Sequence, residues 1–135
     1  MLVTDIDGTL LNTDCTCDKA MFDTILKLNK MGIKVVLASG RMFDGVWPVA
    51  KQFELETPVI CYQGAVVRDD KKIYWQAPLK KDMALDVLET LKKENVHTHL
   101  YNNDILYVDD DNKKIMNDYF YKKSHFVSIL KLSLK

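Results

Sequence analysis

Short apolar runs alternate with helical periodicity over the first 64 residues. Uninterrupted apolar runs over residues 2–4, 33–38 and 58–62 are typical of strands buried on both faces of a sheet. Between them, residues 18–31 and about 43–53 repeat apolar positions at helical spacing. The order strand, helix, strand, helix, strand predicts a βαβαβ unit with a parallel sheet and right-handed crossovers.

Local signals predict how these helices begin and end. Either Thr16 or Asp18 can cap the first helix, and Gly32 is expected just past its end. In the second helix, Pro48 can be tolerated only near the first turn. Asp44 is expected to cap that helix rather than to contact a substrate.

The pattern changes after residue 64. AVVR and IYWQ, joined by the turn DDKK, predict a hairpin over residues 65–76. Pro78 marks a boundary, beyond which we expect a helix over 80–94, two strands around an Asn-Asn-Asp turn within 98–110, a helix over 112–123, and an apolar stretch over 126–134. The chain is therefore expected to form two units, residues 1–77 and 78–135.

Side-chain spacing gives further expectations for the second unit. Tyr101 and Tyr107 are expected to pair across the predicted hairpin. His97 and His99 would share one face of a strand, where a partly exposed surface is favoured over a metal site because no third ligand accompanies them. On the helix expected over residues 80–94, four apolar side chains should face inward: Met83, Val87, Leu88 and Leu91.

The composition narrows the class of protein. The chain has 135 residues, of which 47% are hydrophobic, so a packed core is expected rather than disorder. Basic and acidic residues number 19 each, so neither nucleic acid nor an anionic membrane is expected as the main partner. No apolar run approaches the ~20 residues of a membrane helix. Three cysteines, two of them in a Cys-x-Cys spacing, favour reduced thiols in a cytoplasmic protein.

Candidate chemistry lies where the three predicted strands end. Asp5 and Asp7 follow the first strand in VTDIDGTLLN, where an ordinary turn would also account for Asp and Gly. Ser39-Gly40-Arg41 follows the second strand, and Gln63-Gly64 follows the third. Ligands bind beyond the carboxyl ends of parallel strands, so carboxylates, a hydroxyl and glycine-bearing loops should converge on one spot. A turn-only explanation does not predict that convergence.

These motifs resemble those of the haloacid dehalogenase-like hydrolases. DIDGTLL is similar to the first family motif, Asp-x-Asp-Gly-Thr-Leu, and SGR is similar to the second. CYQGA resembles the Tyr-Asn-Gly-Ala segment of the sugar-phosphatase branch, with Gln63 where Asn is usual. The resemblance implies an α/β fold: a three-layer Rossmann-like core with an α/β cap inserted after the third strand, the class IIB arrangement. Residues 78–135 would form part of that cap.

The resemblance also implies a magnesium-dependent phosphatase that acts on a small phosphorylated metabolite, such as a sugar phosphate. Asp5 would be the nucleophile that forms an aspartyl-phosphate, and Asp7 would protonate the leaving alcohol and then activate water. Mg²⁺ would bind a side-chain oxygen of Asp5 and the backbone carbonyl of Asp7. The phosphoryl oxygens would be held by Gly8, Ser39 and Gly40.

The remaining motif residues would support this site. Thr9 would brace the first loop, and Arg41 would either orient substrate or anchor its loop. Gln63 and Gly64 would complete the substrate side. The Asp-x-Asp motif of sugar-nucleotide transferases is an alternative, but it lacks the nearby Gly-Thr and the Ser-Gly-Arg after the second strand.

Two further motifs of the family are not found in this sequence. One is a lysine that neutralises the phosphate, and the other is an acidic pair within Gly-Asp-x-x-Asn-Asp. Both normally lie beyond the cap, and this sequence ends inside it. The run over 109–111 lacks the glycine context and is expected to form a solvated turn. The alternative function is therefore a truncated or degenerate member without catalysis.

The missing strands have a structural consequence. Residues 2–5 would form an exposed apolar edge, and such edges recruit another strand. We expect a second chain, a swapped element or missing residues to cover it, so a homo-oligomer or strand-exchanged assembly is a possible state.

Overall fold

The computed structural model describes residues 1–108 and 126–128. The chain divides into two compact units, Met1–Ala77 and Pro78–Lys135. Three expectations lie outside the described residues: the helix over 112–123, the acidic turn over 109–111, and the apolar stretch beyond residue 128. In the part of the chain that is described, no helix has the length and hydrophobicity needed to cross a membrane.

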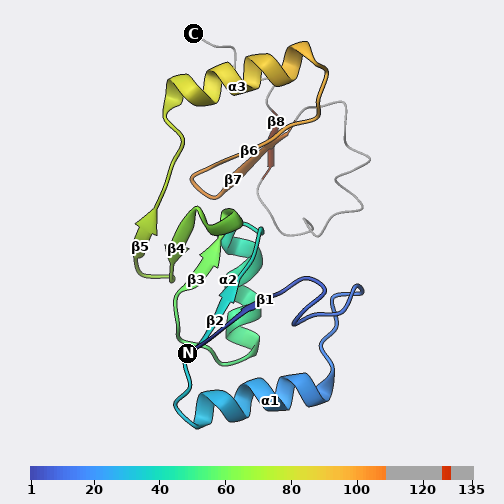
Figure 1. The fold of residues 1–135 in the computed structure, drawn as a ribbon, viewed down its shortest axis with the longest axis vertical. Helices are drawn as coiled ribbons and strands as arrows, with labels where there is room; N and C mark the ends of the chain where they lie inside the picture. The colour runs from blue at the N-terminus through green and yellow to red at the C-terminus, as the bar shows by residue number, and fades with distance from the viewer. Residues whose placement is uncertain (109–125, 129–135) are drawn as a thin grey trace. The chain divides into compact units, whose positions relative to one another are not determined.

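A five-stranded sheet forms the centre of the first unit (Figure 1). The first three strands are parallel, and the last two continue the sheet as an antiparallel hairpin. Two helices connect the parallel strands, so the predicted βαβαβ unit and hairpin are confirmed. In sheet order, the strands are β1 (Leu2–Asp5), β2 (Val35–Ala38), β3 (Val59–Cys61), β4 (Val66–Arg68) and β5 (Ile73–Gln76).

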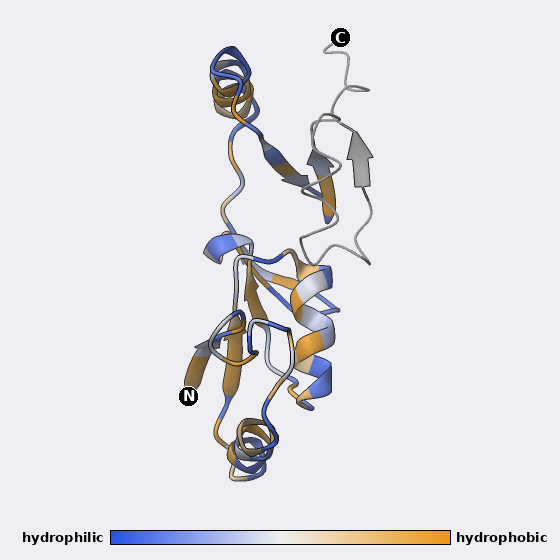
Figure 2. Cartoon of the chain, turned by 90° about the vertical axis from the view of Figure 1, so that its right-hand side faces the viewer, coloured by the Kyte–Doolittle hydropathy of each residue, from blue (hydrophilic) through white to orange (hydrophobic). Residues whose placement is uncertain are grey.

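Helix α1 (Lys19–Lys30) connects β1 to β2, and helix α2 (Phe43–Gln52) connects β2 to β3. They meet where the rings of Phe22 and Phe53 lie 5.0 Å apart between centroids. Hydrophobic residues dominate the parallel strands of this unit in Figure 2, whereas the helices carry hydrophilic residues on part of their surface. The second helical layer of the expected three-layer core is not among the described residues. The largest fully buried side chains of this unit are Ile6, Val35, Leu37, Met42, Val46, Phe53, Leu55, Val59 and Cys61.

Strand β1 lies at one edge of the sheet. It pairs with β2 alone among the described strands, from Leu2 opposite Val35 to Asp5 opposite Ala38. The expectation of a strand buried on both faces is therefore wrong here, because Leu2 remains 38% exposed and Val3 47% exposed. The expected exposed apolar edge is confirmed for the described residues.

The three α-helices of the described residues end in the same hydrogen-bonded turn. After α1, the Gly32 amide donates to the Asn29 carbonyl and the Ile33 amide donates to the Leu28 carbonyl. This Schellman pattern needs a left-handed residue just past the helix, which is Gly32 at φ 78°. The predicted role of Gly32 is confirmed. The equivalent residues after α2 and α3 (Lys81–Lys93) are Glu54 at φ 55° and Asn95 at φ 54°.

The helix starts differ from expectation. Asp18 occupies the N-cap position of α1, but its side chain makes no capping hydrogen bond and instead accepts one from the side-chain nitrogen Nδ2 of Asn12. Met42 is the N-cap of α2, so Asp44 lies inside the first turn rather than at the cap. Pro48 lies inside α2 beyond the first turn, so the expectation that this proline lies near the first turn is also wrong.

The second unit contains α3 and a three-stranded sheet in the order β6 (His99–Asn102), β7 (Ile105–Val108) and β8 (Phe126–Ser128). The first two strands form the predicted antiparallel hairpin, and β8 pairs parallel to β7. Asn103 and Asp104 both have positive φ, at 50° and 59°, as a tight two-residue hairpin turn requires.

Two side-chain expectations for the second unit are wrong. Tyr101 lies opposite Leu106 and Tyr107 lies opposite Leu100, so the two tyrosines occupy opposite faces of the hairpin. On α3, Met83 and Val87 are exposed, and Leu88 and Leu91 are half-buried. A helical spacing identifies an apolar face but does not show how much of that face is covered.

Candidate functional site

The loops that follow the three parallel strands lie together at the carboxyl ends of these strands. Asp5 is in register with Ala38, and Ala38 is in register with Ile60. The Ser39 amide donates to the Ile60 carbonyl at 2.9 Å, and the Tyr62 amide donates to the Arg41 carbonyl at 2.9 Å. Backbone hydrogen bonds therefore join the second and third loops directly.

The first loop exposes two carboxylates by burying the residue between them. Ile6 is fully buried, and its carbonyl accepts the amides of Leu10 at 3.0 Å and Leu11 at 2.8 Å. Asp5 and Asp7, on either side of Ile6, are both exposed. Within the described residues the Asp5 carboxylate makes no hydrogen bond or ion pair. Its oxygens are therefore available to a ligand.

Gly8 sets the direction of the first loop. Its φ of 74° lies in the left-handed region, and a β-carbon at this position would meet nothing within 4 Å. The glycine is therefore required by the backbone conformation rather than by crowding. The Gly8 amide already donates to the Leu11 carbonyl at 2.9 Å, so its expected bond to a phosphoryl oxygen would require that contact to open.

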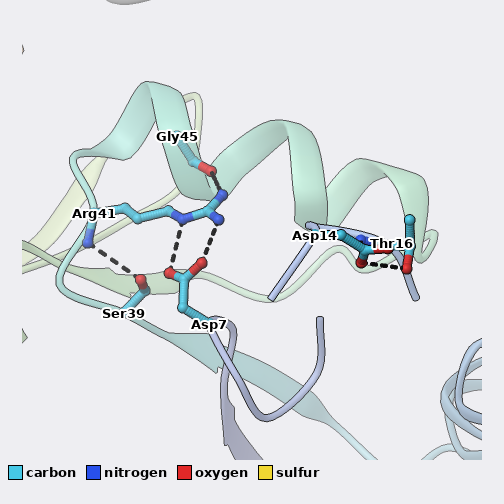
Figure 3. Close-up of polar contacts among 6 residues, drawn as sticks. All are labelled: Asp7, Asp14, Thr16, Ser39, Arg41 and Gly45. Carbon is cyan, nitrogen blue, oxygen red and sulfur yellow. Dashed lines mark hydrogen bonds and ion pairs between the residues drawn. The ribbon is translucent and has the colours of Figure 1, made fainter. Parts of the chain in front are cut away.

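Arg41 joins the second loop to the first (Figure 3). Its Nε donates to Asp7 Oδ2 at 2.9 Å, and a terminal guanidinium nitrogen donates to Asp7 Oδ1. The other terminal nitrogen donates to the Gly45 carbonyl at 3.3 Å, at the start of α2. A planar guanidinium held at three points fixes the direction of the carboxylate that it binds. These hydrogen bonds tie Arg41 to Asp7 and to the start of α2, and its role toward a substrate stays a prediction.

Ser39 and Gly40 follow β2, and Gly40 lies against the Gln63 side chain of the third loop. Ser39 is buried, and its Oγ accepts the Arg41 amide at 3.1 Å. Since that oxygen acts as an acceptor, the hydroxyl hydrogen can be donated elsewhere. A β-carbon on Gly40 would lie 2.3 Å from Gln63 Nε2, so the glycine makes room for the Gln63 side chain.

The third loop has a strained backbone. Tyr62, Gln63 and Gly64 have consecutive positive φ values of 54°, 55° and 90°. Only glycine adopts this region without cost, and asparagine tolerates it better than glutamine. Such strain is concentrated at functional sites in folded proteins.

The outer part of the first loop is held by short-range contacts. Thr9 is exposed, and its amide reaches the Ile6 carbonyl at 3.4 Å, a weak backbone bracing contact. Asp14 Oδ1 accepts the Thr16 hydroxyl at 2.6 Å and the Thr16 amide at 3.0 Å (Figure 3). These hydrogen bonds from Thr16 lower the pKa of the Asp14 carboxyl below its usual 3.8.

The donor chemistry of the site suits a hard cation. Mg²⁺ prefers oxygen ligands, and proteins commonly bind it through one or two carboxylates together with water and substrate phosphate. Asp5 could offer a carboxylate oxygen and Asp7 its backbone carbonyl, because the Asp7 side chain is held by Arg41. In the residues that the structure describes, no cluster of three or more His, Cys, Asp or Glu side chains could hold a metal ion.

Sequence reasoning missed two contributors to the site. The Gly45 carbonyl holds the Arg41 guanidinium, and the Tyr62 amide closes the third loop onto the second. Both contacts use backbone atoms, so no residue type marks them in the sequence.

The family model for haloacid dehalogenase-like hydrolases matches residues 2–134 of this chain. The chain belongs to this family. The match covers both units, so the resemblance carried by DIDGTLL, SGR and CYQGA extends well beyond the three loops.

Curated relatives of this chain carry phosphatase names. Phosphatase YwpJ of Bacillus subtilis is 25% identical over 118 residues, which are 87% of this chain and 41% of YwpJ. A putative phosphatase of Streptococcus pyogenes, M6_Spy0533, is 31% identical over 119 residues, covering 83% of this chain and 44% of that protein. The chain therefore spans less than half the length of these relatives.

Solved structures confirm the fold of the family. A haloacid dehalogenase-like hydrolase from B. subtilis aligns with a TM-score of 0.83 and 22% identity, over 99% of this chain and 56% of its own. The subclass IIB sugar phosphatase BT4131 aligns with a TM-score of 0.78 and 18% identity, over 96% and 53%. At these identities the likeness shows the α/β fold alone.

Proposed function

We propose that this chain carries the nucleophile and the proton-transfer group of a magnesium-dependent phosphomonoester hydrolase. One observation carries the proposal: the first loop presents two carboxylates, Asp5, which has no partner among the described residues, and Asp7, which is bound by Arg41. Membership of the family and the phosphatase names of the relatives support it.

The chemistry divides between the two carboxylates. An oxygen of Asp5 attacks phosphorus and the bond to the leaving oxygen breaks, which gives an aspartyl-phosphate and an alcohol. Asp7, in its carboxylic acid form and with an oxygen released from its contact with Arg41, supplies the proton that the alcohol takes up. Asp7 then accepts a proton from water as that water attacks the aspartyl-phosphate, which releases phosphate and restores Asp5. A bound Mg²⁺ would reduce the repulsion between the Asp5 carboxylate and the phosphate dianion.

Neighbouring groups would hold the phosphoryl oxygens during these steps. The Ser39 hydroxyl is the first candidate, because its oxygen is fixed by the Arg41 amide while its hydrogen can be donated. The Gly40 backbone adjoins it, and Gln63 covers Gly40. We assign Gly64 to the same group of phosphate-facing residues, since its left-handed backbone conformation turns the third loop.

We propose that residues 1–77 are the first part of the catalytic core and that residues 78–135 are part of an α/β cap. The cap would select a small phosphorylated metabolite, such as a sugar phosphate, and the name of BT4131, a sugar phosphatase, supports this substrate class. The three free cysteines among the described residues fit a reducing compartment, so we propose a cytoplasmic location.

A second candidate is a member of the family without catalysis. Asp5 and Asp7 have no third acidic partner among the described residues. Such a protein would keep the fold and could bind phosphate weakly without turning substrate over.

The test is hydrolysis of p-nitrophenyl phosphate with and without Mg²⁺, by the wild type and by Asp5→Asn. Asp23→Asn is the matched control, since Asp23 is an exposed carboxylate on α1. Turnover that needs both Asp5 and the cation, and that survives in Asp23→Asn, supports the enzyme. A wild type with a native circular dichroism spectrum and no turnover supports the second candidate.

A further inference from the structure

His97 and His99 form a close imidazole pair in the second unit. Their Nε2 atoms lie 2.9 Å apart, and their rings are nearly perpendicular with centroids 4.7 Å apart. His99 begins β6, and both side chains are half-buried. His97 lies two residues earlier, just outside the strand, so the pair sits at the start of β6.

The separation of the two Nε2 atoms matches the bite of a metal chelate. Imidazole nitrogens lie about 2.0–2.1 Å from a bound divalent transition metal. Two such ligands at a right angle are therefore about 2.9 Å apart by simple geometry. The observed distance equals that value, whereas ideal tetrahedral ligands would be about 3.4 Å apart on the same bond lengths.

We propose that His97 and His99 form a two-imidazole site for a divalent transition metal ion that accepts ligands at right angles. Ni²⁺ and Cu²⁺ accept this geometry, and imidazole suits both ions. Water or another small oxygen ligand would fill the remaining positions, because the described residues contain no cluster with a third protein ligand. The site is separate from the proposed Mg²⁺ site, since Mg²⁺ selects oxygen rather than imidazole.

Binding requires a specific change in the pair. At 2.9 Å one ring donates its Nε2 hydrogen to the other ring, so only one Nε2 lone pair is free of a hydrogen. The donor ring would move that hydrogen to Nδ1, and both Nε2 lone pairs would then face the metal. No proton is gained or lost overall, and the ion replaces the hydrogen bond as the link between the rings.

The test is a calorimetric titration of the full chain with NiCl₂ at pH 7.5. His97→Gln and His99→Gln should each weaken Ni²⁺ binding by about tenfold or more, because each change leaves a single imidazole. His125→Gln is the matched control, since it removes the only other histidine of the sequence and should leave the affinity unchanged. A Cys15→Ser/Cys17→Ser variant should also bind as the wild type does, which separates imidazole from thiolate binding.

A second measurement does not depend on the variants folding. Ni²⁺ added to the wild type should selectively broaden the imidazole NMR signals of His97 and His99. The proposal is overturned if the wild type does not bind Ni²⁺, if the broadening falls on other residues, or if either histidine variant binds with unchanged affinity.

Discussion

Arg41 and Asp7 are separated by 34 positions in the sequence, yet they form a two-point ion pair. This pair joins the loop that follows β1 to the loop that follows β2. Their side chains are 19% and 44% exposed. An ion pair with this much solvent contact contributes about 0.2–1 kcal/mol to folding. Its main effect is therefore on the direction of the Asp7 carboxylate, the proposed proton-transfer group, rather than on stability.

Arg41→Lys tests this positioning. Lysine keeps the positive charge but cannot bind both carboxylate oxygens in the planar manner of arginine. We expect kcat for p-nitrophenyl phosphate to fall about 10–100-fold, as for other displaced catalytic groups, with a change in unfolding free energy below about 1 kcal/mol. Arg68→Lys is the control, because it makes the same change at an arginine whose guanidinium carbon contacts a different group, the Phe43 ring, at 4.0 Å from the ring centroid. Equal losses in both variants would show that the Asp7 contact has no special role.

Glu54 provides a prediction about stability. It occupies the left-handed position after α2 at φ 55°, where glycine is strongly preferred. Its amide donates to Lys51 and its carbonyl accepts the Asn29 side chain, and both bonds use backbone atoms of residue 54. Glu54→Gly should therefore raise the unfolding free energy by about 0.5–1 kcal/mol, measured by urea denaturation.

Glu56→Gly is the matched control for this change. Glu56 is also exposed, but it is not among the non-glycine residues of the described chain that have positive φ. Glycine there increases the freedom of the unfolded chain without relieving strain, so stability should fall or stay constant. Stabilisation of both variants to the same extent would remove the conformational explanation.

The sequence was sufficient for the elements that local patterns determine. Apolar runs predicted β2 and β3, and Gly32 marked the end of α1 because glycine is the usual residue of that turn. The end of α2 carries no such mark, since glutamate gives no signal for a left-handed backbone. The inward positions on α3 were also misjudged, because helical spacing shows a face but not its cover.

The site was predictable as a set of loops but not as a set of contacts. The rule for parallel sheets brought Asp5, Ser39 and Gln63 to one edge without any knowledge of distances. The Arg41 contact with Asp7 depends on the path of two loops, which residue types alone do not determine. The opposed faces of Tyr101 and Tyr107 depend on strand register, and a shift of one residue reverses such an assignment.

Asp69 and Tyr74 give a prediction about pH. The Tyr74 hydroxyl and the amides of Lys71 and Lys72 donate to the Asp69 carboxylate, which lowers the pKa of Asp69 below its usual 3.8. A lowered carboxyl pKa stabilises the hairpin above the unfolded value, and this stabilisation is lost as pH falls through the folded value. Tyr74→Phe should therefore move the Asp69 pKa upward, measured by NMR titration of its carboxyl carbon.

The same contact acts on Tyr74 in the opposite direction. The hydrogen bond to Asp69 raises the pKa of the Tyr74 hydroxyl above its usual 10.0. Its contribution to stability is thus complete below pH 10 and is lost as pH rises through the folded value. Asp69→Asn should lower the Tyr74 pKa toward its usual value, followed by ultraviolet absorbance, whereas Asp70→Asn in the same turn should leave it unchanged. A Tyr74 titration that is the same in all three proteins would contradict the assignment.

The open edge of β1 predicts association through strand pairing. Val3 is 47% exposed on an edge whose outer backbone groups no described strand pairs with. We expect the chain to self-associate as concentration rises, because exposed apolar edges recruit further strands. Val3→Lys should shift sedimentation toward the monomer, since a charged side chain on an edge opposes pairing. Val96→Lys is the control, because Val96 is 48% exposed but lies outside the strands. A wild type that remains a monodisperse monomer at millimolar concentration, or a Val96→Lys variant that dissociates equally, would show that the β1 edge does not drive assembly.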